Sequence, residues 1–119
     1  MNYASGLAQQ TAKLHSLISN HPAIAEHPKG HSKYVLRYRT SCGAELAVEK
    51  RAGTPLLYFT RSLAEGRIDD LNPEWLPASM EGRNSNLNTL ETFRSQSLAR
   101  LRVTTLETAR KALDACVGR

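Results

Sequence analysis

Alternation of apolar and polar side chains is the strongest pattern in the chain, and it runs from residue 33 to residue 61. In 33–40 the even positions carry tyrosine, leucine and threonine, whereas most odd positions carry lysine or arginine. Two more alternating runs, 44–51 and 56–61, follow after short loops that contain glycine. A period of two with branched and aromatic residues is typical of β-strands, and such loops are typical of hairpins. The stretch therefore predicts a three-stranded antiparallel β-meander over 33–61.

The first loop of this meander also predicts a strand register. A three-residue connection pairs Tyr38 with Leu46, and it pairs Leu36 with Val48, so that the large apolar residues share one face. Slipping the register by one residue would move Glu45 onto the face of the tyrosines, which is unfavourable for a buried face. We therefore expect one apolar face and one face rich in charged residues.

Helical periodicity appears at both ends of the chain. Apolar residues recur every three or four positions in 3–19 and again in the last stretch from residue 106, which predicts one amphipathic helix in each. Thr104 and Glu107 fit a capping box at the start of the second helix. Between the meander and this helix, alternation in 98–103 predicts a fourth strand.

The segment 62–97 connects the meander to the fourth strand and has a different composition. Its first part carries five acidic residues against Arg67 alone. Asn72–Leu76 resembles an N-cap followed by one short helical turn, and Leu87–Phe93 has the spacing of a short helix or 3₁₀ turn. A further helical turn is expected in Pro22–His27, before the meander.

These elements predict a single domain over 1–119 with an α+β fold. The expected architecture is a two-layer sandwich: a mostly antiparallel four-stranded sheet, built from 33–61 and 98–103, covered on one face by the N- and C-terminal helices. The second face is expected to be open or covered by the crossing segment 62–97.

Composition adds a basic balance to this picture. The chain has 119 residues, a net charge of +5 and a pI near 9.6, which favours polyanionic partners, nucleic acid first. Two cysteines and a start without a signal-like pattern point to a reducing compartment, and no run approaches membrane-spanning length. We therefore expect a cytoplasmic protein that acts away from membranes.

Most basic residues of the predicted strands fall on the sheet face that the helices do not cover. Arginines around an aromatic ring can hold phosphates and stack on a base, and the polar loop after Gly82 can contact base edges or phosphate. The alternatives are a solvated face with cross-strand ion pairs and an ordinary loop of turn-forming residues. The predicted nucleic-acid-binding residues are Lys33, Arg37, Arg39, Arg51, Tyr58, Arg83, Asn84, Ser85, Asn86, Arg100 and Arg102.

No motif for a cofactor, metal or catalytic centre stands out. Four histidines precede Cys42 within a short span, but their spacing matches no standard zinc motif, so we predict no metal site and no cofactor. A small ribonuclease needs a base, an acid and a phosphate clamp, and the chain offers the residue types in His31, Glu49, Arg37 and Arg83. Catalysis is therefore kept as an alternative only.

The leading hypothesis is a small non-catalytic protein or accessory domain that binds DNA or RNA. It rests on the composition of the stretch Lys29–Arg61, which contains seven basic residues and two acidic ones. One alternative is a regulator or inhibitor, of phage or mobile-element type, that binds a nucleic-acid-processing protein through Trp75 in the acidic crossing. Another is a ribonuclease-type toxin, and a homodimer is compatible with all of these.

Overall fold

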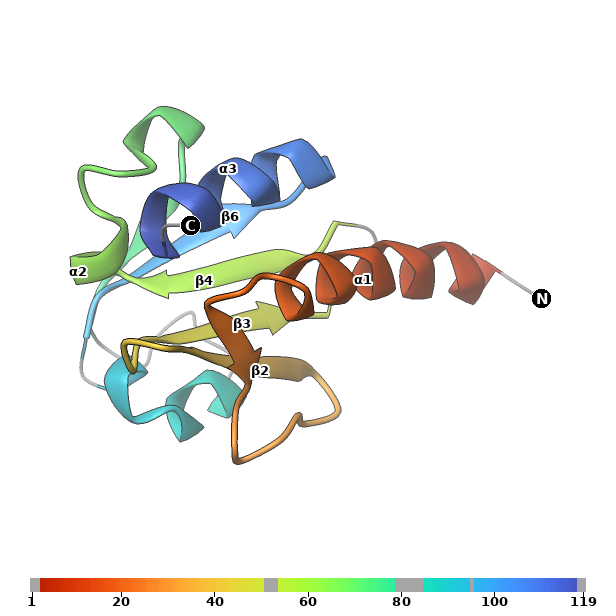
Figure 1. Cartoon of the computed structure of the whole chain (residues 1–119), viewed down its shortest axis with the longest axis horizontal. Helices are drawn as coiled ribbons and strands as arrows, with labels where there is room; N and C mark the ends of the chain where they lie inside the picture. Colours follow the sequence, from red (N-terminus) through yellow and green to blue (C-terminus); the bar gives the residue numbers. More distant parts are fainter. Residues whose placement is uncertain (1–2, 51–53, 79–84, 95, 118–119) are drawn as a thin grey trace.

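Six antiparallel strands form one sheet at the centre of the molecule, in the order β1-β2-β3-β4-β6-β5 (Figure 1). The structure is a computed structural model, and it describes residues 3–50, 54–78, 85–94 and 96–117. Strands β2, β3 and β4 are the predicted meander, and β6 is the predicted fourth strand. The strands are β1 (Ile24–Glu26), β2 (Val35–Thr40), β3 (Glu45–Glu49), β4 (Leu56–Thr60), β5 (Glu74–Leu76) and β6 (Leu98–Arg102).

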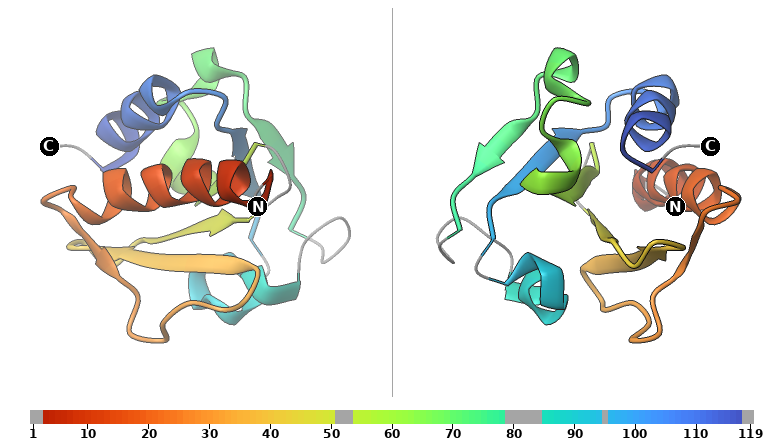
Figure 2. Two further views of the ribbon diagram at one scale, coloured as in Figure 1. Left: turned by 90° about the vertical axis from the view of Figure 1, so that its right-hand side faces the viewer. Right: turned by 60° about the vertical axis from the view of Figure 1, so that its left-hand side comes forward.

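Helices cover the sheet on one side and 3₁₀ turns cover it on the other (Figure 2). The two long helices, α1 and α3, lie together on the first side, whereas η2 and η3 lie on the second. The predicted α+β fold with terminal helices on one face is therefore confirmed, with six strands in place of four. The helical elements are α1 (Tyr3–Ser19), α2 (Arg61–Ala64), η1 (Asp69–Leu71), η2 (Ser85–Thr89), η3 (Glu91–Phe93) and α3 (Leu106–Val117).

The predicted register of the first hairpin is confirmed. Tyr38 lies opposite Leu46, and Leu36 lies opposite Val48. Gly43 occupies the left-handed position of the connecting loop, with φ of 90°, where a residue with a β-carbon would be strained. The apolar face built in this way packs under α1 and α3, in a core that includes Leu14, Ile18, Tyr38, Leu46, Val48, Leu57, Phe59, Leu101, Leu113 and Cys116.

A second hydrophobic core lies between the second face of the sheet and the crossing segment. Leu87, Leu90 and Phe93 of the crossing segment are fully buried there. They pack against the strand residues Val35, Ala47, Leu56, Tyr58 and Leu98. Of the two arrangements expected for this face, the covered one is present. The molecule therefore has three layers, and the described residues of this face form a core in place of an open basic platform.

Two short predicted helical turns are strands instead. Residues 24–26 form β1, which pairs with the end of β2, and residues 74–76 form β5, which pairs with β6. Asn72, predicted as a helix N-cap, adopts a left-handed conformation with φ of 57° after η1 and directs the chain into β5. Local capping signals are outweighed here because each segment gains ladder hydrogen bonds at an edge of the sheet.

The start of α3 differs from the prediction by one residue. The Thr105 hydroxyl oxygen accepts a hydrogen bond from the Thr108 amide at 3.2 Å, so Thr105 is the N-cap in place of Thr104. The buried stripe of this helix, with Ala109, Leu113 and Cys116, agrees with the predicted one. None of the helices in the described residues is long and apolar enough to cross a membrane.

Candidate functional sites

The predicted platform on the second sheet face is buried at its centre. Tyr58 is fully buried, and its hydroxyl donates a hydrogen bond to Glu49 at 2.6 Å, so its ring has no free face for a base. Burial, followed by the contact with Glu49, raises the pKa of the Tyr58 hydroxyl above its ordinary value. Arg37 is only 7% exposed and donates to the Gly30 carbonyl at 3.1 Å. Neither residue is available to a nucleic acid in this structure.

Two other predicted arginines lie apart from each other. Arg100 makes two hydrogen bonds of 3.0 Å to the carboxylate of Glu74, and this pairing raises the pKa of its guanidinium further above the ordinary value. Arg39 is exposed but lies opposite Ala25 at the far edge of the sheet. The predicted residues Arg51, Arg83 and Asn84 lie outside the described residues, as do the side chains of Ser85 and Asn86.

Exposed cations gather instead at one end of the sheet. Val35, Glu49, Leu56 and Arg102 are aligned across four strands, where β2 and β4 begin and β3 and β6 end. In Figure 1 this is the end toward which the β3 and β6 arrows point. We call this region the basic end and define it by Lys13, Lys33, Tyr34, Lys50 and Arg102, all of which are exposed.

Tyr34 is the exposed aromatic residue of the basic end. Its side chain is 51% exposed, and the Lys33 ammonium lies 5.4 Å from the centre of its ring. The Lys50 amide donates a hydrogen bond to the Tyr34 carbonyl at 2.9 Å, which extends the β2–β3 ladder by one residue. Lys50 therefore lies opposite Tyr34 across the ladder, and Lys33 precedes Tyr34 along the chain.

Helix α1 and the end of β6 complete the basic end. Lys13 of α1 lines a depression together with Pro55, the last residue before β4, and Val103, the first residue after β6. Helix α3 begins nearby, and its first-turn carboxylate, Glu107, accepts a hydrogen bond from Arg110 at 3.3 Å. The acidic side chain of Glu49 in the aligned row is buried and bonded to Tyr58, so it contributes little to the outer surface.

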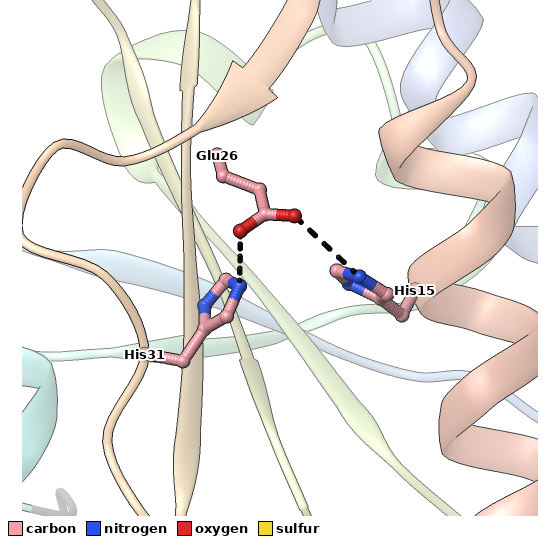
Figure 3. Close-up of side chains that lie close together, drawn as sticks. All are labelled: His15, Glu26 and His31. Carbon is pink, nitrogen blue, oxygen red and sulfur yellow. Dashed lines mark hydrogen bonds and ion pairs between the residues drawn. The ribbon is translucent and has the colours of Figure 1, made fainter.

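A second cluster joins three elements on the first side of the sheet (Figure 3). Glu26 of β1 lies between two histidines: the His31 Nε2 is 3.1 Å from its Oε1, and the His15 Nε2 of α1 is 3.8 Å from its Oε2. The nearest ring nitrogens and carboxylate oxygens lie within 4.8 Å of one another. Tyr38 lies beside both rings, and its hydroxyl is 2.8 Å from the His15 Nδ1.

Histidine and carboxylate side chains at this spacing suggest a zinc site, since two histidines and a glutamate are a known zinc ligand set. The hydrogen bonds of His31 argue against it. The Arg37 amide donates to the His31 Nδ1 at 2.9 Å, so the proton of this ring is on Nε2, where it points to Glu26. A metal ligand needs a lone pair on Nε2, and metal-bound histidines normally donate through their other nitrogen. His31 therefore fits a hydrogen-bonding role and does not fit a metal ligand.

The same arrangement recurs at two other histidines. His21 and His27 each accept a main-chain amide through Nδ1, from Ala23 and Lys29, both at 3.1 Å. Their Nε2 atoms face carboxylates, at 3.9 Å from Asp114 for His21 and at 2.5 Å from Glu45 for His27. Three of the four histidines thus connect a main-chain turn to an acidic side chain. Only His15 lacks such a main-chain donor among the recorded hydrogen bonds of the described residues.

The His27–Glu45 pair is almost fully buried and holds η3 on the sheet. The second oxygen of Glu45 accepts hydrogen bonds from the amide and the hydroxyl of Thr92, both at 2.8 Å. Burial alone would raise the pKa of Glu45, but the bonds from Thr92 and His27 outweigh it and lower the pKa below its ordinary value. This network is a structural junction between β3, η3 and the β1–β2 connection.

Sequence reasoning missed the basic end although it named two of its members. Lys33 and Arg102 were predicted as part of a platform on the sheet face, whereas Lys13, Tyr34 and Lys50 were not predicted. Tyr34 belongs to the face that packs under the helices, but it lies one residue before β2, beyond the covered area. The signal for the histidine turns was present, because His21 and His27 each precede a proline.

Comparison of the chain with protein-family models, with curated proteins and with solved structures gave no match. The functional argument therefore rests on the geometry of the described residues.

Proposed function

We propose that this chain is a small nucleic-acid-binding protein that uses the basic end of its sheet. The observation that carries the proposal is the half-exposed ring of Tyr34, which has the Lys33 ammonium over it and Lys50 opposite it across the ladder. Cations around an exposed aromatic ring are the combination that phosphates and bases require. With strands about 4.8 Å apart, the row from β2 to β6 spans roughly 14 Å, which lets several cations contact one backbone at once.

The ion pairing of the exposed cations favours the basic end over the predicted sheet face as the binding site. Within the described part of the chain, the lysines of the basic end form no ion pair, whereas Arg100 is paired with Glu74. Long-range attraction from the net charge of +5 adds to the local effect by increasing the rate of encounter with a polyanion.

The test is fluorescence anisotropy with labelled DNA and RNA oligonucleotides across a series of salt concentrations. We expect the variant Lys33→Gln with Lys50→Gln to bind about tenfold more weakly at low salt, and to lower the slope of log affinity against log salt by about 1.5 to 2. The matched control is Arg110→Gln with Lys111→Gln, which removes the same two charges from exposed positions on α3 and should change affinity less than twofold.

An affinity that is insensitive to salt, or an equal loss in the control, would contradict the proposal. Absence of binding to either polymer would shift attention to a protein partner. The surface to examine would then be Trp75 on the edge strand β5, which is 37% exposed and stacks with the Arg61 guanidinium at 5.3 Å.

A further inference from the structure

We infer that the nucleic acid bound at the basic end is single-stranded, and that one unpaired base stacks on the ring of Tyr34. This inference rests on the proposed function and adds the class of polymer to it. It follows from comparing the two large apolar side chains that are exposed in the described part of the chain, Tyr34 and Trp75.

The surroundings of the two rings differ in charge. Each ring has one cation over it, Arg61 at Trp75 and Lys33 at Tyr34. Trp75 also follows a segment with the exposed residues Glu65, Asp69 and Asp70, so a polyanion is repelled from it. Tyr34 has the Lys33 ammonium over its ring and Lys50 opposite it across the ladder, so the phosphates next to a stacked base meet positive charge. Of the two exposed rings, only Tyr34 is placed for a base.

The position of Tyr34 is also well defined before any ligand binds. Its carbonyl accepts the Lys50 amide at 2.9 Å, and the next residue, Val35, accepts the Ser32 amide at 2.9 Å. Bonds on both sides hold the backbone, so binding requires little ordering of the chain, which favours affinity. A tyrosine ring has few rotatable bonds, and its exposed face is offered at low entropic cost.

Stacking on a side chain selects single strands because of the structure of the duplex. In a double helix each base is stacked on both faces, and only base edges and the backbone reach a protein surface. Unpaired bases can turn outward and stack on aromatic side chains, and each such contact contributes about 1–3 kcal/mol. A duplex would engage only the cations of the basic end.

The experiment compares oligo(dT), oligo(U) and a mixed-sequence duplex of the same length against three proteins: the unmodified chain, Tyr34→Phe and Tyr34→Leu. We expect Tyr34→Leu to bind the single strands at least fivefold more weakly and the duplex less than twofold more weakly, since leucine keeps apolar bulk but has no ring. Tyr34→Phe should bind as the unmodified chain does. Thermal unfolding of each variant checks that the fold is intact, and the half-exposed position makes this control straightforward.

The outcomes separate this inference from the proposed function. If Tyr34→Leu leaves single-strand binding unchanged while Lys33→Gln with Lys50→Gln weakens it, the stacking inference is wrong and the proposed function stands. Tighter binding of the duplex than of both single strands overturns the inference in the same way. If no polymer binds, both fail. Oligo(dT) and oligo(U) together report whether the site distinguishes DNA from RNA.

Discussion

At the scale of single residues, the histidines show how one side chain can be polar, half-buried and structural at once. His31 lies next to Glu26 and His15 in a geometry that resembles a metal site by distance alone. The hydrogen bond at its Nδ1 argues against metal binding. Because Nδ1 accepts the Arg37 amide at 2.9 Å, the ring proton is on Nε2, and Nε2 has no lone pair for a metal. Beyond the end of β1, the His31 ring therefore accepts the main-chain hydrogen bond from β2 that a neighbouring strand would otherwise accept.

A first prediction follows for zinc. Added Zn²⁺ should leave the thermal unfolding temperature unchanged, since binding would require His31 to give up the Arg37 amide. A three-ligand site would instead raise this temperature by several degrees at saturating metal. Differential scanning calorimetry with Zn²⁺ or a chelator measures the effect. A rise that disappears in both His15→Ala and His31→Ala would show that the loop releases the amide and that the cluster binds metal.

Glu45 gives a second prediction at this scale. In Glu45→Gln the NH2 that replaces one oxygen must face either the Nε2–H of His27 or the amide N–H of Thr92, so two donors meet in a buried site in both orientations. We expect a loss of about 1–3 kcal/mol in the free energy of unfolding, measured by urea denaturation. The matched control, Glu91→Gln on the exposed side of η3, should stay within about 0.5 kcal/mol.

The pH dependence of this effect has a definite sign. The pKa of Glu45 in the folded chain is lower than its ordinary value of 4.5, so its stabilising contribution is complete above about pH 4.5 and is lost as the pH falls through the lower value. The difference between the unmodified chain and Glu45→Gln should therefore shrink on acidification. A difference that grows in acid would mean that the Thr92 and His27 bonds do not stabilise the carboxylate.

At the scale of elements, the crossing segment determines which sheet face is available for binding. The segment that contains η2 and η3 places three large apolar side chains on the second face. There they pack against small or apolar strand residues such as Ala47. This packing explains why the centre of the second face is buried, although Arg37 and Tyr58 point to that face. The cations that remain exposed are those at the margin, where η2 and η3 do not reach.

Phe93 tests this arrangement directly. Phe93→Ala should lower the free energy of unfolding by about 3–5 kcal/mol, because it empties a fully buried site between η3 and the sheet. Glu91→Ala, in the same 3₁₀ turn but exposed, should cost less than about 1 kcal/mol. Urea unfolding of both variants gives the comparison. Equal costs would mean that the segment does not cover the second face in solution.

At the scale of the whole molecule, the charges are separated in space as well as along the chain. Exposed acidic residues lie in the stretch that leads from the end of α2 into the edge strand β5, namely Glu65, Asp69, Asp70 and Glu74. Lys33 and Lys50 lie where β2 begins and β3 ends. The radius of gyration of 13.2 Å agrees with the roughly 13.5 Å expected for a compact domain of this length. Both edge strands are short, and homodimerisation through them stays a prediction.

The sequence by itself determined what depends on neighbours along the chain. The period of two in 33–61, the period of a helix in 3–19 and the three-residue loop with Gly43 specify strands, a helix and a hairpin register through local geometry. The spacing of Leu87, Leu90 and Phe93 likewise predicted a short helix or 3₁₀ turn, and two 3₁₀ turns are present. These predictions are confirmed because each depends on bonds and side chains only a few residues apart.

Only the tertiary structure decided which surfaces are exposed and which residues meet. Whether Tyr58 faces water depends on the segment around residue 90, and whether His31 can bind a metal depends on the amide of Arg37. Residues 24–26 and 74–76 became strands because partners far along the chain offered them ladder hydrogen bonds. Burial and hydrogen bonding between distant segments are properties of the packed chain, so alternation alone could not distinguish a basic surface from a second core.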